Sequence, residues 1–369
     1  MQEKNKMNKF IYLDSAATMQ KSDAVIDAQT LFLREKYANS GRGVCMRVAA
    51  VDDMVRDTRR SIAEFINADY RDVIFTSGTT DAFNRIVNIL KPKPYTVVAV
   101  SDLDHHSARL PFQMAGAKIT VCPLDDNMNI DIDNVPYADV FVVTAMSNVL
   151  GMPQDVAAIV HAAREKNPDV IVVVDAAQYV VHEKIDVKKW DCDFLAFSGH
   201  KIGADTGVGV MYIKNADGYP ADKFGGGMVE RRIYENDFLF MRAPEKFEAG
   251  TLPLTQICGF GRAVREIQSA RPDLNLIKYL YDELLKINRV KILTRRDASM
   301  LSFIIDGVHV LDFGAIAGAH NICVRVGNMC ASWIHQHLNI DGSIRVSVGP
   351  HNTKDDIDSF ISVVRGCVK

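Results

Sequence analysis

The sequence predicts an α/β fold in which a mostly parallel sheet is covered by helices on both faces. Between about residues 52 and 215, short runs rich in β-branched residues alternate with segments whose apolar residues recur at helical spacing. The short runs are nearly continuously apolar, which is typical of strands buried on both faces. After about residue 255 the pattern changes, and a smaller α+β domain is expected to follow the large one.

The large domain is expected to contain two well-marked helices and seven strands. The helices are expected over 52–68 and 80–90, where apolar side chains fall on one helical face. The expected strands are 73–75, 96–100, 119–121, 140–144, 170–174, 194–197 and 208–213.

The C-terminal part is expected to begin with two amphipathic helices, 259–270 and 273–288, separated by Arg271-Pro272. Three shorter strands are expected to follow at 300–305, 322–326 and 344–348. A last helix is expected to run to about Cys367, with Thr353 as its N-cap and Asp356 completing a capping box.

Composition excludes several classes of protein. A chain of 369 residues is long enough for two domains. The net charge of −3, with both signs mixed throughout, gives no field that would gather nucleic acid or anionic lipid. The apolar runs stop far short of the roughly 18 residues of a membrane span, and the start, MQEKNKMNKF, lacks the apolar core of a secretory signal. We therefore expect a cytoplasmic protein.

The seven cysteines form no C-x-x-C pair, so a zinc site is not indicated. His335 and His337 form an H-x-H pair without a third ligand at suitable spacing. The sequence therefore predicts no metal site.

A segment after the first expected strand is suited to binding phosphate. TSGTT at 76–80 links that strand to a helix N-terminus, where free N–H groups, the helix dipole and hydroxyl donors favour an anion. The alternative is an ordinary capped helix start. The segment matches neither G-x-G-x-x-G nor a Walker A loop, so a nicotinamide dinucleotide or ATP is not indicated.

Two further strand ends carry an acid and a lysine. Asp175 follows the run at 172–174, where a lone carboxylate needs a cation such as a protonated ring nitrogen, although it could instead cap the next helix. Lys201 ends the segment SGHK at 198–201, where desolvation would make its amine nucleophilic, although it could be a surface lysine. A phosphate cradle, an acid for a ring nitrogen and a lysine for a Schiff base are together what pyridoxal 5′-phosphate requires.

Motifs along nearly the whole chain are similar to those of one enzyme family. They are YLDSAAT at 12–18, RG at 42–43, TSGTTDA at 76–82, DHHS at 104–107, SNVLG at 147–151, VVDAAQ at 173–178, DCDFLAFSGHKIGADTGVGVMY at 191–212, GGGM at 225–228, FEAGT at 247–251, VRVGNMCA at 324–331 and IRVSVGPHNT at 344–353. On these motifs the sequence resembles the pyridoxal-phosphate-dependent class V aminotransferase family of fold type I. Within that family it is most similar to the group II (SufS/CsdA-like) cysteine desulfurases.

The resemblance implies a division into three parts. Residues 1–20 would be an N-terminal segment that packs with the small domain, 21–254 the large cofactor-binding domain, and 255–369 the small domain that carries the nucleophilic cysteine.

The resemblance also implies roles for the matching residues around the cofactor. Lys201 would bind it covalently, Asp175 would pair with its pyridinium nitrogen, and His105 would stack on its ring. Gln178 and Asn148 would lie near the ring oxygen or the substrate carboxylate. The residues that would hold the phosphate are Thr79, Thr80, Ser198, His200 and, from a second subunit, Thr251. A site shared between subunits implies a homodimer.

In the implied reaction, Arg345 would clamp the substrate α-carboxylate and Cys330 would be the nucleophile. The enzyme would cleave the C–S bond of L-cysteine to give L-alanine and a persulfide on Cys330. That sulfur would pass to an acceptor, as in iron–sulfur cluster assembly. The alternative for Cys330 is a small buried residue without a chemical role.

Two departures from the family pattern leave other activities open. Asn328 and Met329 stand where many group II members have paired histidines, and Cys45 stands where a histidine often follows the RG pair. Both positions would face the substrate, so a selenocysteine lyase, sulfinate lyase, epimerase or aminotransferase is the alternative. If Cys45 came near Cys330, it could receive sulfur or form a disulfide. A catalytically silent homologue acting as a scaffold is disfavoured because the cofactor residues are intact.

Overall fold

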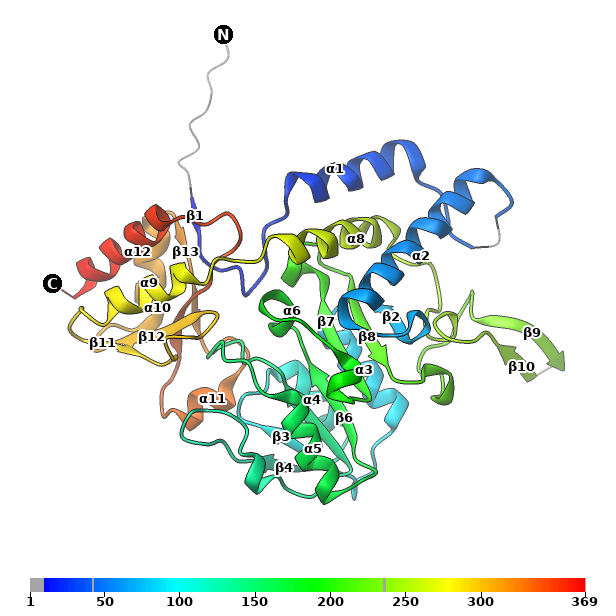
Figure 1. Ribbon diagram of the computed structural model, residues 1–369, viewed down its shortest axis with the longest axis horizontal. Helices are drawn as coiled ribbons and strands as arrows, with labels where there is room; N and C mark the ends of the chain where they lie inside the picture. Colours follow the sequence, from blue (N-terminus) through cyan, green and yellow to red (C-terminus); the bar gives the residue numbers. More distant parts are fainter. Residues whose placement is uncertain (1–9, 42, 235–236, 369) are drawn as a thin grey trace, which may run out of the picture.

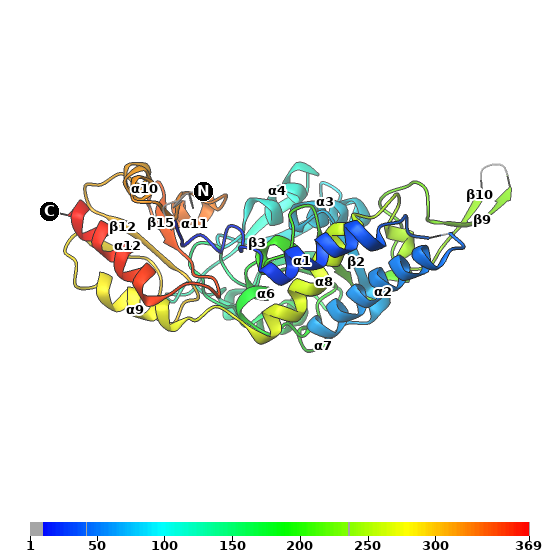
Figure 2. The same cartoon turned by 90° about the horizontal axis from the view of Figure 1, so that it is seen from above.

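The computed structural model describes residues 10–41, 43–234 and 237–368. Arg42 of the RG motif and residues 1–9 of the expected N-terminal segment lie outside this range. Figure 1 shows the small C-terminal domain at one end of the molecule and a protruding hairpin, β9 (Val229–Tyr234) and β10 (Asp237–Phe240), at the other. Figure 2 shows the same elongated arrangement from above.

The large domain is built on a seven-stranded sheet with the order β2-β8-β7-β6-β5-β3-β4. The strands are β2 (Val73–Thr76), β3 (Val97–Ser101), β4 (Lys118–Cys122), β5 (Val140–Thr144), β6 (Ile171–Asp175), β7 (Phe194–Ser198) and β8 (Gly209–Ile213). Neighbours from β4 to β7 pair in parallel, whereas β8 is antiparallel to both β7 and β2. The predicted mostly parallel sheet and its seven strands are confirmed.

Both faces of this sheet are buried, as the apolar runs predicted. In β5, Phe141 and Val143 belong to one apolar core while Val140 and Val142 belong to another. Alternate residues of a strand point to opposite faces, so each face has its own core. The helices of the large domain are α1 (Asp23–Leu31), α2 (Met46–Ile66), α3 (Thr79–Leu90), α4 (His106–Met114), α5 (Val156–Lys166), α6 (Tyr179–His182), α7 (Val187–Trp190) and α8 (Leu254–Ser269).

The small domain packs α9 (Asn275–Leu284), α10 (Val310–Ala319) and α12 (Lys354–Cys367) with an antiparallel sheet of order β11-β12-β15-β14. Its strands are β11 (Val290–Ile292), β12 (Leu301–Ile305), β14 (Arg325–Gly327) and β15 (Ser343–Val346). The short helix α11 (Ser332–His337) lies between β14 and β15 in the chain. The predicted capping box of Thr353 and Asp356 at the start of α12 is confirmed.

The structure corrects four predicted elements. The helix expected at 273–288 ends at Leu284. The helix expected at 52–68 begins at Met46, because its first turns are exposed and carry no apolar periodicity. The helix expected at 259–270 begins at Leu254. The strand expected at 322–326 is two strands, since β13 (Ile322–Cys323) pairs with β1 (Ile11–Tyr12) whereas β14 pairs with β15.

The N-terminal segment joins the small domain. β1 pairs in parallel with β13, and Leu13 lies in the core of the small domain. The division of the chain at residues 20 and 254 stays a prediction. Among the described residues, no helix is both long and apolar enough to cross a bilayer.

Candidate active site

A cavity of about 300 Å³ lies where the large sheet meets the small domain. Asp175 ends β6 and Ser198 ends β7, and β2, which precedes the TSGTT segment, runs parallel to β7. Carboxyl ends of parallel strands meet at one edge of a sheet, which is where open α/β folds bind ligands. Eleven of the twelve predicted site residues line this cavity: Thr79, Thr80, His105, Asn148, Asp175, Gln178, Ser198, His200, Lys201, Cys330 and Arg345. Their individual roles stay predictions.

One end of the cavity is formed by the N-terminus of α3 and is rich in hydroxyl groups. The Thr79 N–H donates to Ser198 Oγ at 2.8 Å, and the two hydroxyl groups are 2.8 Å apart. Gly78 precedes the helix with φ of 149°, and a Cβ there would lie 3.1 Å from Ser198 Oγ. Nδ1 of His200 is buried without a hydrogen-bond partner. This end can therefore bind an anion through backbone, hydroxyl and imidazole donors.

Asp175 lies at the floor of the cavity and is 5% exposed. Its Oδ1 accepts a 2.9 Å hydrogen bond from the Ala177 N–H. Burial raises the pKa of Asp175 to about 6, against the lowering effects of that hydrogen bond and of Lys201. A buried carboxylate of this kind is stabilised by a cationic partner such as a protonated ring nitrogen.

His105 caps the N-terminus of α4. The Ser107 N–H donates to His105 Nδ1 at 3.1 Å, which leaves the proton of the neutral ring on Nε2. Burial, with smaller contributions from Lys201, His106 and Arg345, lowers the pKa of His105 to about 4. The imidazole is therefore neutral at pH 7 and presents an uncharged aromatic ring to the cavity.

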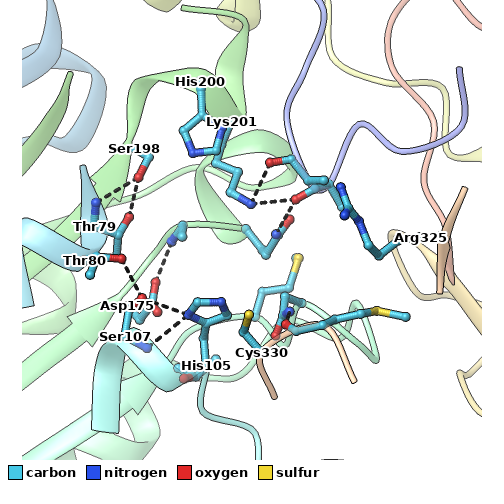
Figure 3. A pocket seen from close by; sticks show the side chains of 18 of the residues that line it. Thr79, Thr80, His105, Ser107, Asp175, Ser198, His200, Lys201, Arg325 and Cys330 are labelled. Carbon is cyan, nitrogen blue, oxygen red and sulfur yellow. Dashed lines mark hydrogen bonds between the residues drawn. The ribbon is translucent and has the colours of Figure 1, made fainter. Parts of the chain in front are cut away.

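Lys201 follows β7 and reaches across the cavity to the N-terminal segment. Its Nζ donates to the backbone oxygens of Ala16 at 2.7 Å and Ala17 at 3.2 Å. Burial is the largest cause that lowers the pKa of Lys201 to about 8, followed by the charge of Arg345. Figure 3 shows Lys201 facing the space that His105 and Cys330 face from the other side.

Two amides on the cavity wall have unsatisfied atoms. Gln178 Nε2 donates to the Ala16 oxygen at 2.8 Å and Asn148 Nδ2 donates to the Met329 oxygen at 2.8 Å. Gln178 Oε1 and Asn148 Oδ1 are buried without a partner. Unpaired buried polar atoms are costly, so these oxygens favour a ligand with hydrogen-bond donors.

Cys330 lies on a short loop between β14 and α11 and is exposed. Met329 and Cys330 both have positive φ, 52° and 55°, which is unusual for residues other than glycine. The His106 N–H donates to the Cys330 oxygen at 2.8 Å, and the Asn328 side chain accepts from the Cys330 N–H at 3.3 Å. These contacts, together with the one from Asn148, hold the strained loop at the cavity mouth.

Arg345 is 2% exposed and extends from β15 into the cavity. It donates from Nη1 to the backbone oxygen of Asn148 at 2.7 Å and from Nη2 to Asp14 Oδ1 at 3.0 Å. Arg325, from β14, also lines the cavity and donates to Asp14 Oδ2 at 2.6 Å. Arg325 and Asp14 are not among the residues that the sequence predicts for the site, although both lie within the motifs YLDSAAT and VRVGNMCA.

Thr251 lies elsewhere in this chain. It is exposed and lines a separate hollow with Gly226, Gly227 and Arg59, so its expected contribution to a second subunit's site stays a prediction. Cys45 is exposed just before α2 and does not line the Cys330 cavity within the chain.

The H-x-H pair makes other contacts. His335 is buried, with Nδ1 2.9 Å from the Ala331 oxygen and Nε2 3.0 Å from Ser343 Oγ. His337 Nδ1 lies 3.1 Å from Asp102. Within the described part of the chain, no three His, Cys, Asp or Glu side chains group around a possible metal position.

Comparison with known proteins identifies relatives along nearly the full chain. Residues 11–360 match the family described as aminotransferase class-V. A cysteine desulfurase of Escherichia coli O127:H6 is 30% identical over 373 residues, which cover 95% of this chain and 91% of that protein.

Two solved structures are similar in both sequence and fold. The apo structure of the cysteine desulfurase from Thermococcus onnurineus has a TM-score of 0.92 at 30% identity, covering 98% of this chain and 95% of that one. The cysteine desulfurase CsdA from Escherichia coli, in an S-sulfonic acid form, has a TM-score of 0.87 at 30% identity, covering 96% and 94%.

Proposed function

This chain belongs to the class-V aminotransferase family, and on that premise we propose that it is a pyridoxal-phosphate-dependent cysteine desulfurase. It cleaves the C–S bond of L-cysteine, releases L-alanine and retains the sulfur as a persulfide on Cys330. The observation that carries the proposal is the meeting of Lys201, Asp175 and the α3 N-terminus with Cys330 in one cavity. The relatives that bear the name cysteine desulfurase cover almost the whole chain.

The chemistry of the residues that line the cavity fits pyridoxal phosphate. The α3 N-terminus, the Ser198 hydroxyl and the unpartnered His200 Nδ1 would hold the phosphate. Asp175 would pair with the ring nitrogen, and the unpartnered oxygens of Gln178 and Asn148 lie on the wall beside it. When bound, the cofactor supplies an electron sink for negative charge at the substrate Cα.

The chain's own residues supply positioning and proton transfer. Lys201, with its lowered pKa, would attach the cofactor and, once released by substrate, remove the Cα proton with its neutral amine. The ring of His105 is neutral, so it would stack on the cofactor without adding a positive charge beside it. Arg345 would hold the substrate carboxylate and so fix which bond faces the Cys330 thiolate.

Cys330 would attack the substrate sulfur as a thiolate, because the thiolate and not the thiol is the nucleophile. Its exposed position at the cavity mouth would leave the resulting persulfide within reach of an external acceptor. We therefore propose that the sulfur passes to an acceptor protein, as in iron–sulfur cluster assembly. We also propose that the protein is a cytoplasmic homodimer in which the partner's Thr251 completes the site.

A product assay tests this proposal. L-Cysteine, selenocysteine and cysteine sulfinate are supplied separately, with and without a thiol reductant, and alanine and the released sulfur or selenium species are quantified. We expect alanine from L-cysteine, with sulfide release dependent on the reductant. Turnover of selenocysteine or of cysteine sulfinate, without turnover of L-cysteine, would instead identify one of the alternative lyases. Formation of a keto acid would identify an aminotransferase.

Attachment of pyridoxal phosphate to the cofactor-free protein is expected to accelerate as pH rises through about 8, the pKa to which burial lowers Lys201. Only the neutral amine has a lone pair for the aldehyde, and its fraction rises about tenfold per pH unit below the pKa and levels off above it. Stopped-flow absorbance between about pH 6 and about pH 9 measures the rate. Butylamine, whose amine pKa is near the ordinary value of about 10.4, is the control and should show no plateau near pH 8. A protein rate that still rises about tenfold per pH unit between about pH 8 and about pH 9 would contradict the lowered pKa.

A further inference from the structure

We infer that His106 is a positioning residue for the proposed reaction: its imidazole fastens the loop that carries Cys330 to helix α4 of the large domain and so holds the thiol where it can attack the substrate. The inference rests on the proposed function, because it concerns how the nucleophile of that reaction is held. The proposed reaction gives a role to the first histidine of the DHHS motif, His105, and none to the second. His105 lines the cavity, whereas His106 does not.

The Cys330 loop needs support from outside itself. Met329 and Cys330 have left-handed φ values of 52° and 55°, and such residues persist only where the surrounding structure holds them. Within the loop, Asn328 accepts a hydrogen bond from the Cys330 N–H at 3.3 Å and another from the Ala331 N–H at 2.9 Å. These two bonds leave the three successive carbonyl oxygens at 329–331 to be bound by residues outside the loop.

Those three carbonyl oxygens are bound one after another. The first accepts from Asn148 Nδ2 at 2.8 Å, and the second, of Cys330 itself, accepts from the His106 N–H at 2.8 Å. The third lies 2.9 Å from Nδ1 of His335 in α11. Asn148 and His106 belong to the large domain, so the position of Cys330 depends on the contact between the two domains.

The ring of His106 makes a second contact, two residues further along the loop. Its Nε2 accepts from the Ser332 N–H at 3.4 Å and lies 2.8 Å from Ser332 Oγ. Because an accepting nitrogen of a neutral imidazole carries no proton, the hydroxyl is the donor and the ring proton is on Nδ1. Burial lowers the pKa of His106, which leaves Nε2 free to accept at pH 7. His106 therefore binds the chain on both sides of Ala331.

Helix α4 also holds Trp333, the next residue of α11. His106 and Arg109 are three residues apart on one face of α4, and both contact Trp333. The imidazole and indole rings meet edge to face with their centroids 5.0 Å apart, and the Arg109 guanidinium carbon lies 4.2 Å from an indole centroid. Nε and Nη1 of Arg109 are buried without a hydrogen-bond partner, so the face of the indole stabilises its charge.

Apolar packing seats α11 on the large domain but does not orient the loop. Ala331 and Ile334 belong to the apolar core of the large domain, although α11 lies between two strands of the small one. Figure 1 shows α11 next to α4, where the two domains meet. The hydrophobic effect is not directional. The direction in which Cys330 points is therefore set by the polar contacts, of which His106 makes those on both sides of Ala331.

The consequence for the reaction is a defect that spares binding. A displacement of about 1 Å in a reacting group can cost about 10²-fold in rate. Removal of the ring contacts of His106 would free the start of α11, and with it Cys330. Lys201, Asp175 and the hydroxyl-rich end of the cavity do not contact this ring and would stay in place. We therefore expect slower attack by the thiol, with cofactor and substrate still bound normally.

The first test compares ring variants of His106 in the holoenzyme. Phenylalanine keeps an aromatic ring beside Trp333 but has no acceptor, whereas glutamine has a carbonyl oxygen near the position of Nε2. For His106→Phe we expect kcat for alanine formation from L-cysteine to fall about tenfold, with KM and the cofactor absorbance nearly unchanged. His106→Gln is expected to stay within about threefold of the unmodified protein. An unchanged kcat in His106→Phe, or equal losses in the two variants, would overturn the inference.

The Ser332 hydroxyl tests the same contact from the other side. Ser332→Ala removes one of the two hydrogen bonds to Nε2, and we expect it to lower kcat about threefold with KM unchanged. The acceptor is already missing in His106→Phe, so the double variant H106F/S332A should lose no more than H106F alone. Losses that multiply would show that the two residues act independently and would overturn the inference. If His106→Phe does not fold, an unchanged kcat in Ser332→Ala would still overturn it.

Hydrogen–deuterium exchange of the holoenzyme, before substrate is added, measures the loop directly. The amides at 330–334 are expected to exchange about tenfold faster in His106→Phe and at nearly the normal rate in His106→Gln. His161→Ala is the matched control, because His161 is exposed on α5, where it lies 3.5 Å from Glu165. This control should change neither kcat nor the exchange of the loop.

Failure of the inference differs from failure of the proposed function. If the unmodified protein does not turn over L-cysteine, the proposed function is wrong, and the exchange experiment still decides whether His106 holds the loop. Exchange at 330–334 that is the same in His106→Phe as in the unmodified protein would overturn the inference, even where desulfurase activity is found.

Discussion

Replacing Lys201 by alanine is expected to abolish the release of alanine from L-cysteine, with a loss of at least about 10³-fold, since the variant lacks both the attachment point of the cofactor and the base for the Cα proton. No second lysine lines the cavity among the described residues, so no other amine can replace it. Alanine formation and the visible absorbance of the purified protein are the two measurements. Both should be lost.

Lys201→Arg sharpens this prediction. Arginine keeps a positive charge that could still bind the Ala16 and Ala17 oxygens, but it does not lose its proton at any pH of interest and cannot supply a neutral amine. We therefore expect the arginine variant to fold and to be as inactive as the alanine variant. Lys214→Ala is the matched control, because Lys214 follows β8, pairs with Asp191 at 2.6 Å and does not line the cavity. Activity retained in Lys201→Arg would show that the amine is not required.

Replacing Cys330 by alanine is expected to lower sulfide release from L-cysteine by at least about 10²-fold while the protein keeps its cofactor absorbance. The reason is that Cys330, exposed at the cavity mouth, would supply the nucleophilic thiol and is not among the residues proposed to hold the cofactor. Sulfide release with a thiol reductant measures the activity, and mass spectrometry of the unreduced protein after one turnover should find the added sulfur only when Cys330 is present.

Cys323→Ala is the control for that experiment. Cys323 is also exposed and lies in β13 of the same domain, but it does not line the cavity. Its replacement should leave sulfide release and the added sulfur unchanged. If Cys330→Ala still turned over L-cysteine at the normal rate, the persulfide mechanism would be wrong even though the cofactor site stands.

The agreement between sequence and structure is best where a feature is local. The strand β6 and Asp175 at its end are contiguous, and a buried strand that ends in a carboxylate places that group at the ligand-binding edge of the sheet. The same holds for TSGTT before α3 and for Lys201 after β7. To predict the place of each of these groups, it was enough to recognise the strand before it, because parallel strands bring their carboxyl ends to one edge of the sheet.

The errors lie where local pattern carries no signal. The first turns of α2 are exposed, so apolar periodicity could not reveal them. The strand expected at 322–326 is apolar apart from Arg325 and has no turn residue to divide it, yet its halves pair with different partners, β1 and β15. Strand pairing depends on the partner's register, which a single segment does not contain.

The sequence by itself predicted the α/β class and the order of the strands along the chain, because short-range periodicity encodes them. Through the resemblance of its contiguous motifs to one family it also predicted residues for a pyridoxal-phosphate site, and eleven of these line one cavity. Only the tertiary structure decided that Arg325 and Arg345 are cross-strand neighbours and that Asp14, more than 300 residues earlier, bridges them. The physical reason is that a buried charged side chain needs an oppositely charged partner close to it in space. Which residue lies there depends on how strands distant in the sequence align, and a local sequence pattern does not contain that information.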